Sequence, residues 1–264
     1  MKRVMNAKRM VMASAVVLAM SMGFTSCKSE WRSIRVMDDG PKLTEVRPLR
    51  GFEEIEINGS PRVCYTQADS FSVCVKGTKT SIENIITDVV DKTLTIRNRG
   101  KISLVNISFS DDDALTVYVT SPDLTAIRLN GSGDFMSDGR IDTDRMDIVL
   151  RGSGDIDVKD IICDRCEVEL IGSGDLNVAN LEAMEASASL VGSGDIYLGL
   201  SKVKDTQLSL KGSGDIDAEF RDDCGAIECE LRGSGDITLK GAVRHFDSHK
   251  YGSGDIHIDR LDVK

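Results

Sequence analysis

A single tetrapeptide, Gly-Ser-Gly-Asp, recurs through the second half of this chain and sets the strongest limit on its fold. Seven copies follow one another at steps of 21, 20, 20, 20, 21 and 19 residues. A fixed step is typical of solenoids, hairpin arrays and propellers, but one propeller blade needs about forty residues. Each copy therefore predicts one turn of a solenoid. The first glycines of the copies are Gly131, Gly152, Gly172, Gly192, Gly212, Gly233 and Gly252.

The residues on both sides of each copy alternate between apolar and polar with a period of two. Leucine stands two positions before the first glycine in six copies, and an apolar residue stands four positions after it in all seven. This alternation is typical of strands with one buried side and one solvent-facing side. We expect Leu170 and Ile216 to point into the core and Asp157 to point outward.

Stacking of successive coils explains the glycines of the repeat. Equivalent residues of neighbouring coils lie about 4.8 Å apart in a parallel β-helix, so each bend has to fit against its own copy. Glycine permits the positive φ and the close backbone approach that such a bend needs. Serine and aspartate suit the bend because their short side chains hydrogen-bond nearby backbone groups. We therefore predict an all-β fold, a parallel β-helix with coils of about twenty residues, each containing two or three short strands.

The aspartates of the repeat form a column of carboxylates. Two carboxylates about 5 Å apart repel by roughly 1 kcal/mol in water and by about 3 kcal/mol at an effective dielectric near 20, so the column needs compensation. Backbone N–H groups, neighbouring bases or bound cations could each supply it. We expect a structural role in the bend and at most weak calcium binding, because one repeat lacks the roughly six to eight oxygens of a tight calcium site. The column contains Asp134, Asp155, Asp175, Asp195, Asp215, Asp236 and Asp255.

The amino terminus has the order of an export signal. Four bases lie within residues 2–9, an apolar stretch covers residues 10–24, and small residues precede Cys27. The apolar stretch is too short to span a bilayer. The segment resembles the signal peptide of a bacterial lipoprotein, which implies cleavage before Cys27 and acylation of that residue. We expect an exported outer-membrane lipoprotein that faces the periplasm or the cell surface.

The chain is acidic, with 33 bases, 43 acids and a formal net charge of -10. Nucleic acid is excluded as a partner, because clustered Lys and Arg are needed to bind a phosphate backbone. Loss of residues 1–26 removes four bases and no acid, which leaves 29 bases against 43 acids and a charge of -14. Anionic headgroups repel such a surface, so we expect the acyl group on Cys27 to provide the attachment to a membrane.

Six cysteines follow Cys27, and an exported protein can oxidise an even number of them. We expect a hairpin over residues 63–75, which would place Cys64 opposite Cys74 and permit a disulfide between them. The Cys163-x-x-Cys166 motif has no second Cys or His pair at zinc-site spacing, so it does not predict a metal site.

These residues together carry a resemblance to a known family. The Gly-Ser-Gly-Asp copies, the stretch 51–59 (Gly-Phe-Glu-Glu-Ile-Glu-Ile-Asn-Gly), the segment 63–75 and Thr-Leu-Thr-Ile at 93–96 resemble the "Putative auto-transporter adhesin, head GIN domain" family of Bacteroidetes envelope proteins. The resemblance covers residues 47–264. It implies a single-stranded right-handed parallel β-helix behind a signal or lipoprotein peptide, with no established activity.

The domain organisation follows from these features. We expect a lipoprotein signal peptide at 1–26, the acylated cysteine and a polar tether at 27–45, and a head GIN-type β-helix domain at 46–264. The first coils, up to residue 126, are less regular than the rest and include an expected helical turn at 81–86.

Two classes of function remain open. Parallel β-helices also include polysaccharide lyases and hydrolases, and paired acids such as Asp155 and Asp157 occur here, so a glycan-active enzyme is the alternative. An active site is a local departure from a repeat, and none interrupts this one. We expect a membrane-anchored, non-catalytic structural or adhesion module without a cofactor, whose partner is an envelope protein or a glycan.

Overall fold

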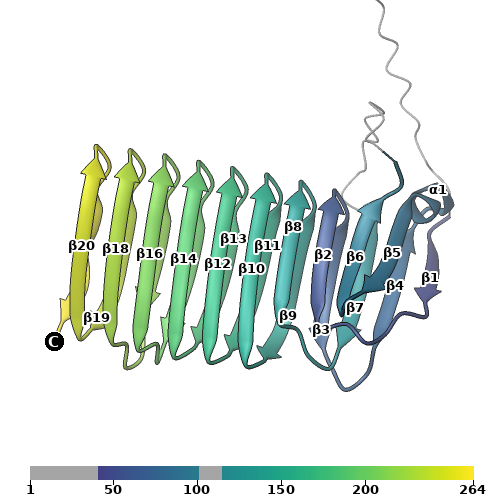
Figure 1. Cartoon of the computed structure of the whole chain (residues 1–264), viewed down its shortest axis with the longest axis horizontal. Coiled ribbons are helices and arrows are strands. Elements are labelled where there is room, and N and C mark those ends of the chain that lie inside the picture. Colours follow the sequence, from purple (N-terminus) through teal and green to yellow (C-terminus); the bar gives the residue numbers. More distant parts are fainter. Residues whose placement is uncertain (1–40, 101–114) are drawn as a thin grey trace, which may run out of the picture. The chain divides into compact units, whose positions relative to one another are not determined.

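The computed structural model describes residues 41–100 and 115–264, which fall within one compact unit, Arg35–Lys264. The expected signal peptide, Cys27 and most of the expected tether lie outside the described residues. Within the described part, the strands form one sheet of 11 strands and one of 10, and a single short helix accompanies them (Figure 1). None of the helical structure in this part is long and apolar enough to cross a membrane.

The two sheets face each other along the stack, with the core between them. Sheet A contains, in spatial order, β1 (Leu43–Arg47), β4 (Ser72–Gly77), β7 (Thr116–Ser121), β3 (Arg62–Gln67), β9 (Asp134–Asp142), β11 (Asp155–Ile162), β13 (Leu176–Glu182), β15 (Ile196–Ser201), β17 (Ile216–Phe220), β19 (Ile237–Val243) and β21 (Ile256–Val263). Sheet B contains β20 (His245–Gly252), β18 (Ala226–Gly233), β16 (Asp205–Gly212), β14 (Glu185–Gly192), β12 (Arg165–Gly172), β10 (Arg145–Gly152), β8 (Ala126–Gly131), β2 (Glu54–Gly59), β6 (Thr93–Asn98) and β5 (Ile85–Val90). The helix α1 covers Lys79–Glu83.

The regular coils have two strands each, one in each sheet, so the predicted all-β parallel β-helix with coils of about twenty residues is confirmed. Successive strands pair in parallel and in register, as where Leu150 of β10 pairs with Leu170 of β12. The apolar columns lie between the sheets as predicted, because both Leu170 and Ile216 are fully buried. The apolar column six positions after the repeat glycine ends at Ile258. This residue lies in the last coil, at the end of the described stack, and is 42% exposed.

The bends between sheet B and sheet A are held by backbone contacts from coil to coil. The carbonyl of Gly152 accepts a hydrogen bond of 2.9 Å from the N–H of Ser173 in the next coil. Gly172, which stacks on Gly152, has φ +142°, and a Cβ built there would lie 2.0 Å from the Gly152 carbonyl oxygen. Only glycine fits this approach, which gives the repeated glycine the packing role that its spacing predicted.

The first coils are stacked out of chain order. Strand β2 lies between β6 and β8, and β3 lies between β7 and β9, so the coil formed by residues 54–67 has a neighbour on each side (Figure 1). On the side away from the regular stack, three pairings are antiparallel: β4 with β7, β1 with β4, and β5 with β6. Strand β1 begins at Leu43, inside the expected tether. Helix α1 overlaps the expected helical turn at 81–86 but begins two residues earlier, at Lys79, and ends at Glu83.

The expected hairpin over 63–75 and its disulfide are wrong. Strand β7 lies between β3 and β4, and Tyr118 of β7 pairs with Cys64 on one side and with Cys74 on the other. Strands two apart in a sheet are separated by about 10 Å, which exceeds the Cα separation of about 7 Å that a disulfide can bridge. Both cysteines are free thiols. The antiparallel pairing of β4 with a strand from later in the chain displaced the local hairpin.

Candidate functional site

The bend column contains one more member than the seven Gly-Ser-Gly-Asp copies. Gly59 pairs with Gly131, and Arg62 pairs with Asp134, so the segment Gly-Ser-Pro-Arg at 59–62 occupies the position of a bend in the coil next to the first copy. Arg62 stands where the repeat has aspartate, and its Nε donates to Asp134 Oδ2 at 3.0 Å. The Gly-Ser pair at 59–60 was the available signal, but 72 residues separate it from the next copy instead of about twenty.

Backbone amides satisfy most of the aspartate column. The N–H of Asp195 donates to Asp175 Oδ1 at 3.2 Å, and the same bond joins each later aspartate to the one before it, at 3.0, 2.8 and 2.7 Å. The N–H of Asp175 likewise donates to Asp155 Oδ1 at 3.2 Å. Each such carboxylate therefore receives a charge-assisted hydrogen bond from the next coil, and this offsets part of the repulsion along the column. Calcium binding by the column stays a prediction.

The far end of the column carries basic groups. Lys250 forms an ion pair with Asp255, and His257 Nε2 lies 3.4 Å from Asp236 Oδ2. The backbone N–H of Asp255 and then the His257 ring hold the pKa of Asp236 below its ordinary value. Among residues 41–100 and 115–264, no group of three or more His, Cys, Asp or Glu side chains is placed to hold a metal ion.

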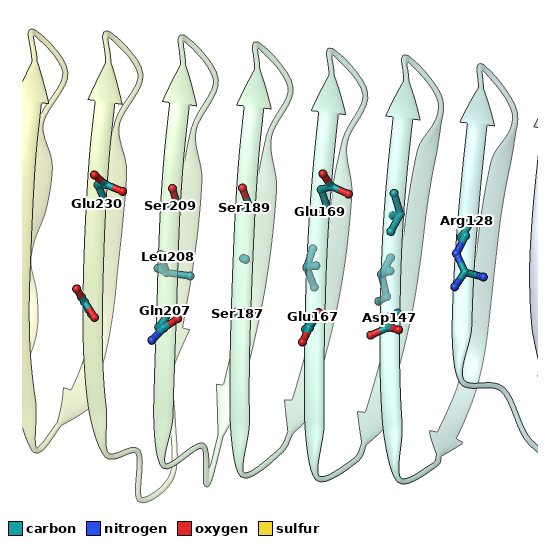
Figure 2. Close-up of a pocket in the computed structure, with 15 residues that line it drawn as sticks. Arg128, Asp147, Glu167, Glu169, Ser187, Ser189, Gln207, Leu208, Ser209 and Glu230 are labelled. Carbon is teal, nitrogen blue, oxygen red and sulfur yellow. The ribbon is translucent and has the colours of Figure 1, made fainter.

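A shallow groove, which was not predicted from the sequence, lies on the outer face of sheet B (Figure 2). Its volume is about 690 Å³. Two rows of outward side chains, three and five positions before the repeat glycine, run across successive strands and form it. The first row is Arg128, Val149, Glu169, Ser189, Ser209 and Glu230, and the second is Asp147, Glu167, Ser187, Gln207 and Glu228.

Side-chain length explains why the groove is where it is. Strand β14 places two serines on its outer face, at 187 and 189, and β16 adds Ser209. The neighbouring strands β12 and β18 carry glutamates at the same row positions (Figure 2). Short side chains between long ones leave a hollow across a sheet that is otherwise evenly covered. The two serines are visible in the sequence. They stand in columns of outward polar residues, however, and the alternation of apolar and polar positions does not distinguish them from the glutamates in the same columns.

Arginines neutralise most of the groove's acidic borders. Arg151 Nη2 lies 3.0 Å from Glu169 Oε2, and Arg165 Nε lies 2.8 Å from Glu167 Oε1. On the other border, Arg232 Nε donates to Glu230 Oε1 at 2.7 Å. These surface pairs add little stability. They leave a groove that carries three serine hydroxyl groups and one amide at its centre, is lined in part by apolar residues such as Val149 and Leu208, and has borders that are close to neutral, apart from Glu228.

The fold and groove define a class of protein, a two-sheet parallel β-solenoid with a polar groove along one outer face. Comparison with protein families places the chain more narrowly: the model of the "Putative auto-transporter adhesin, head GIN domain" family matches residues 51–222 and 201–264. The chain belongs to this family, so the resemblance seen in the sequence is confirmed.

Solved structures agree with this assignment. A protein described as a "putative adhesin" from Bacteroides fragilis is 25% identical, with a TM-score of 0.73 over 82% of this chain and 96% of that one. A "putative adhesin" and a "putative lipid binding protein", both from Parabacteroides distasonis, share the fold at 20% and 24% identity, with TM-scores of 0.63 and 0.64. They cover 83% and 86% of this chain and 98% of their own lengths. No curated protein matches the chain.

Proposed function

We propose that this chain is a non-catalytic adhesion module of a bacterial cell envelope and that the groove on sheet B binds its partner. The observation that carries the proposal is the groove itself, an open polar hollow that crosses several coils of an otherwise uniform stack. A ligand lying in it would contact several strands at once, which suits an extended chain better than a small molecule in a closed pocket. The adhesin description of the family supports the same role.

The chemistry of the groove favours a glycan as the partner. Ser187, Ser189, Gln207 and Ser209 offer hydroxyl and amide groups that can donate or accept hydrogen bonds. A glycan presents hydroxyl groups of the same kind. On the same face, Tyr251 is 61% exposed and has Arg232 5.3 Å from its ring centroid, so an aromatic surface lies next to the groove's Glu230 border. A basic protein segment fits less well, because arginines already occupy most of the carboxylates.

The absence of catalysis is part of the proposal, and it rests on the ion pairs that the acidic side chains of the groove form. Glycosidic cleavage needs a pair of carboxyl groups with separate acid and base roles. In the groove, Glu167, Glu169 and Glu230 each form an ion pair with an arginine, so none of these three carboxylates is left without a partner.

Attachment to a membrane through acylated Cys27 and location in the outer membrane complete the proposal. The order of basic, apolar and small residues before Cys27 supports them. The acyl group would hold the solenoid near the membrane, with the groove facing the periplasm or the medium.

The test is glycan binding by a variant that fills the groove. Wild-type protein is screened on an array of neutral and acidic oligosaccharides, and the hits are measured by calorimetry. Ser189→Trp should abolish binding, because the indole occupies the floor between Glu169 and Ser209. Thr238→Trp on the outward side of β19 in sheet A is the matched control and should bind as wild type does. Equal binding by both variants, no hit for the wild type, or release of reducing ends from a bound glycan would contradict the proposal.

A further inference from the structure

Cys163 and Cys166 lie at the bend that leads from β11 to β12. Strand β11 ends at Ile162 and β12 begins at Arg165, so only two residues connect the sheets here. Both cysteine side chains face the inside of the same coil and are 7% and 1% exposed. Neither contributes to the groove or to the aspartate column.

The backbone holds this bend from both sides. The N–H of Cys163 donates to the Glu182 carbonyl in the following coil at 3.0 Å. The N–H of Asp164 donates to the Asp144 carbonyl in the preceding coil at 2.9 Å. The two side chains therefore project from a fixed frame into the interior of the coil.

We propose that Cys163 and Cys166 form a reversible disulfide that closes this bend when the chain meets a disulfide oxidant. Both side chains are buried inside one coil, and they come from the two sides of a two-residue bend. Residues that flank so short a bend have Cα atoms in the range that a disulfide spans. The remaining described cysteines lie elsewhere, with Cys64 and Cys74 on the outer face of sheet A and Cys224 and Cys229 in a later coil.

Thiol–disulfide exchange completes the reaction in two steps. The Cys163 thiolate attacks one sulfur of the oxidant, which breaks the oxidant's S–S bond, forms a mixed disulfide and releases one thiolate. The Cys166 thiolate then attacks the Cys163 sulfur, forms the internal S–S bond and releases the second thiolate. Two protein thiols are oxidised, one disulfide is reduced to two thiols, and the two protons pass to the released thiolates.

The roles of the two cysteines follow from their surroundings. Cys163 is the more exposed, and the neighbouring Cys166 thiol lowers the pKa of Cys163, which favours the attacking thiolate. The neighbouring Cys163, together with burial, raises the pKa of Cys166 well above its ordinary value. Cys166 therefore acts second, after the mixed disulfide has removed the neighbouring thiolate.

The test equilibrates purified, fully reduced protein in glutathione buffers of increasing oxidised fraction. Free thiols are then alkylated under denaturing conditions and the peptides are mapped by mass spectrometry. We expect the peptide with Cys163 and Cys166 to lose both alkylation sites together and to become lighter by two hydrogen atoms, while Cys229 stays alkylated. Alkylation of both residues across the whole series, or a link from either one to another cysteine, would overturn the proposal.

Two variants separate this reaction from non-specific oxidation. Cys166→Ser should stop at the first step and accumulate glutathione on Cys163, whereas Cys163→Ser should accumulate none on the buried Cys166. The double variant Cys224→Ser, Cys229→Ser should keep the wild-type link. Equal glutathione adducts on the two single variants would contradict the assigned roles.

In the cell, the disulfide forms only in an oxidising compartment, and this condition rests on the export proposed above. Protein trapped by acid quenching and alkylation of intact cells should carry the link. A link that forms in glutathione buffer but is missing from cells would leave the chemistry intact and argue against export. Absence of the link in both settings would reject the disulfide alone.

Discussion

The carboxylate of Asp175 accepts the backbone N–H of Asp195 from the next coil, at 3.2 Å. A column of like charges is thus also a column of hydrogen-bond acceptors, in which each coil supplies the donor for the coil before it. The aspartate of the repeat therefore acts between coils as well as within its own bend.

Substitution at Asp175 should separate the acceptor from the charge. Asp175→Ala removes the acceptor for the Asp195 N–H and should lower the free energy of unfolding by about 1 kcal/mol, whereas Asp175→Asn keeps an oxygen there and should cost less. Urea unfolding measures both. A larger loss for the asparagine variant would show that charge, and not hydrogen bonding, holds the column.

Calcium should have little specific effect on the same column. We expect a small rise in melting temperature that magnesium reproduces, because no coil supplies enough oxygens for a tight site. Thermal unfolding with each ion at millimolar concentration checks this. A large calcium-specific rise that Asp175→Asn abolishes would establish the ladder as a calcium site.

Gly172→Ala should be strongly destabilising, because the new Cβ would lie 2.0 Å from the Gly152 carbonyl oxygen at a residue with φ +142°. The contact is with backbone, which cannot move without shifting the adjoining coil, so we expect a loss of about 3 kcal/mol or more. Gly139→Ala is the control, since nothing lies within 4 Å of a Cβ there. Similar unfolding midpoints for the two variants would contradict the stacking described for the bend.

Leu170→Asp should cost more than about 4 kcal/mol, because it places an unpaired carboxylate among fully buried side chains. Asp157→Asn on the outward column should cost little, since its Oδ1 can still accept the Asn177 amide at 3.0 Å. Thermal unfolding compares them. Equal shifts would show that the columns are assigned to the wrong sides.

The sequence was sufficient for the regular coils and insufficient for the first ones, for a physical reason. In the regular stack every residue meets its copy about twenty positions away, so spacing alone fixes register, the inward side and the glycine bends. In the first coils the partners of Cys64 are Tyr118 and Met136, which no periodicity connects to it. Local reasoning therefore joined Cys64 to Cys74, the nearest strand in the chain.

The candidate groove was out of reach for a different reason. Its outline depends on the contrast between Ser189 and the glutamates one strand away on either side. All of these are polar and outward-facing, so a pattern of buried and exposed positions treats them alike. Stacking the coils in register was needed before differences in side-chain length along a row became visible.

Acid should selectively remove the contribution of Asp236 to stability. The Asp255 N–H and the His257 ring hold the pKa of Asp236 in the folded state below its ordinary value of 3.8. This contribution is therefore fully present above pH 3.8 and is lost as the pH falls through the lower folded value. The difference in melting temperature between wild type and Asp236→Asn should shrink on acidification, with Asp138→Asn, an exposed site on β9, as control. A difference that stays constant down to strongly acidic pH would contradict this assignment.

Cys27→Ser should release the protein from the membrane fraction. The substitution removes the acceptor for acylation, and the acidic chain has little affinity of its own for anionic lipid. Fractionation of cells, followed by detection of the protein in membrane and soluble pools, measures the effect. An unchanged membrane pool would contradict the lipoprotein proposal.

The coil formed by β2 and β3 has consequences for the order of assembly. Its link to the regular stack joins residues 72 positions apart, as between Thr125 and Glu53, whereas later coils meet their neighbours over about twenty. Closing the longer loop costs about 1 kcal/mol more in chain entropy. Each later coil then adds to a template that is already in place. High contact order is thus concentrated in the first coils, where β3 also pairs with β7 and β2 with β6 over long stretches of chain. Mutations there should slow folding, while those in the distal coils should mainly speed unfolding.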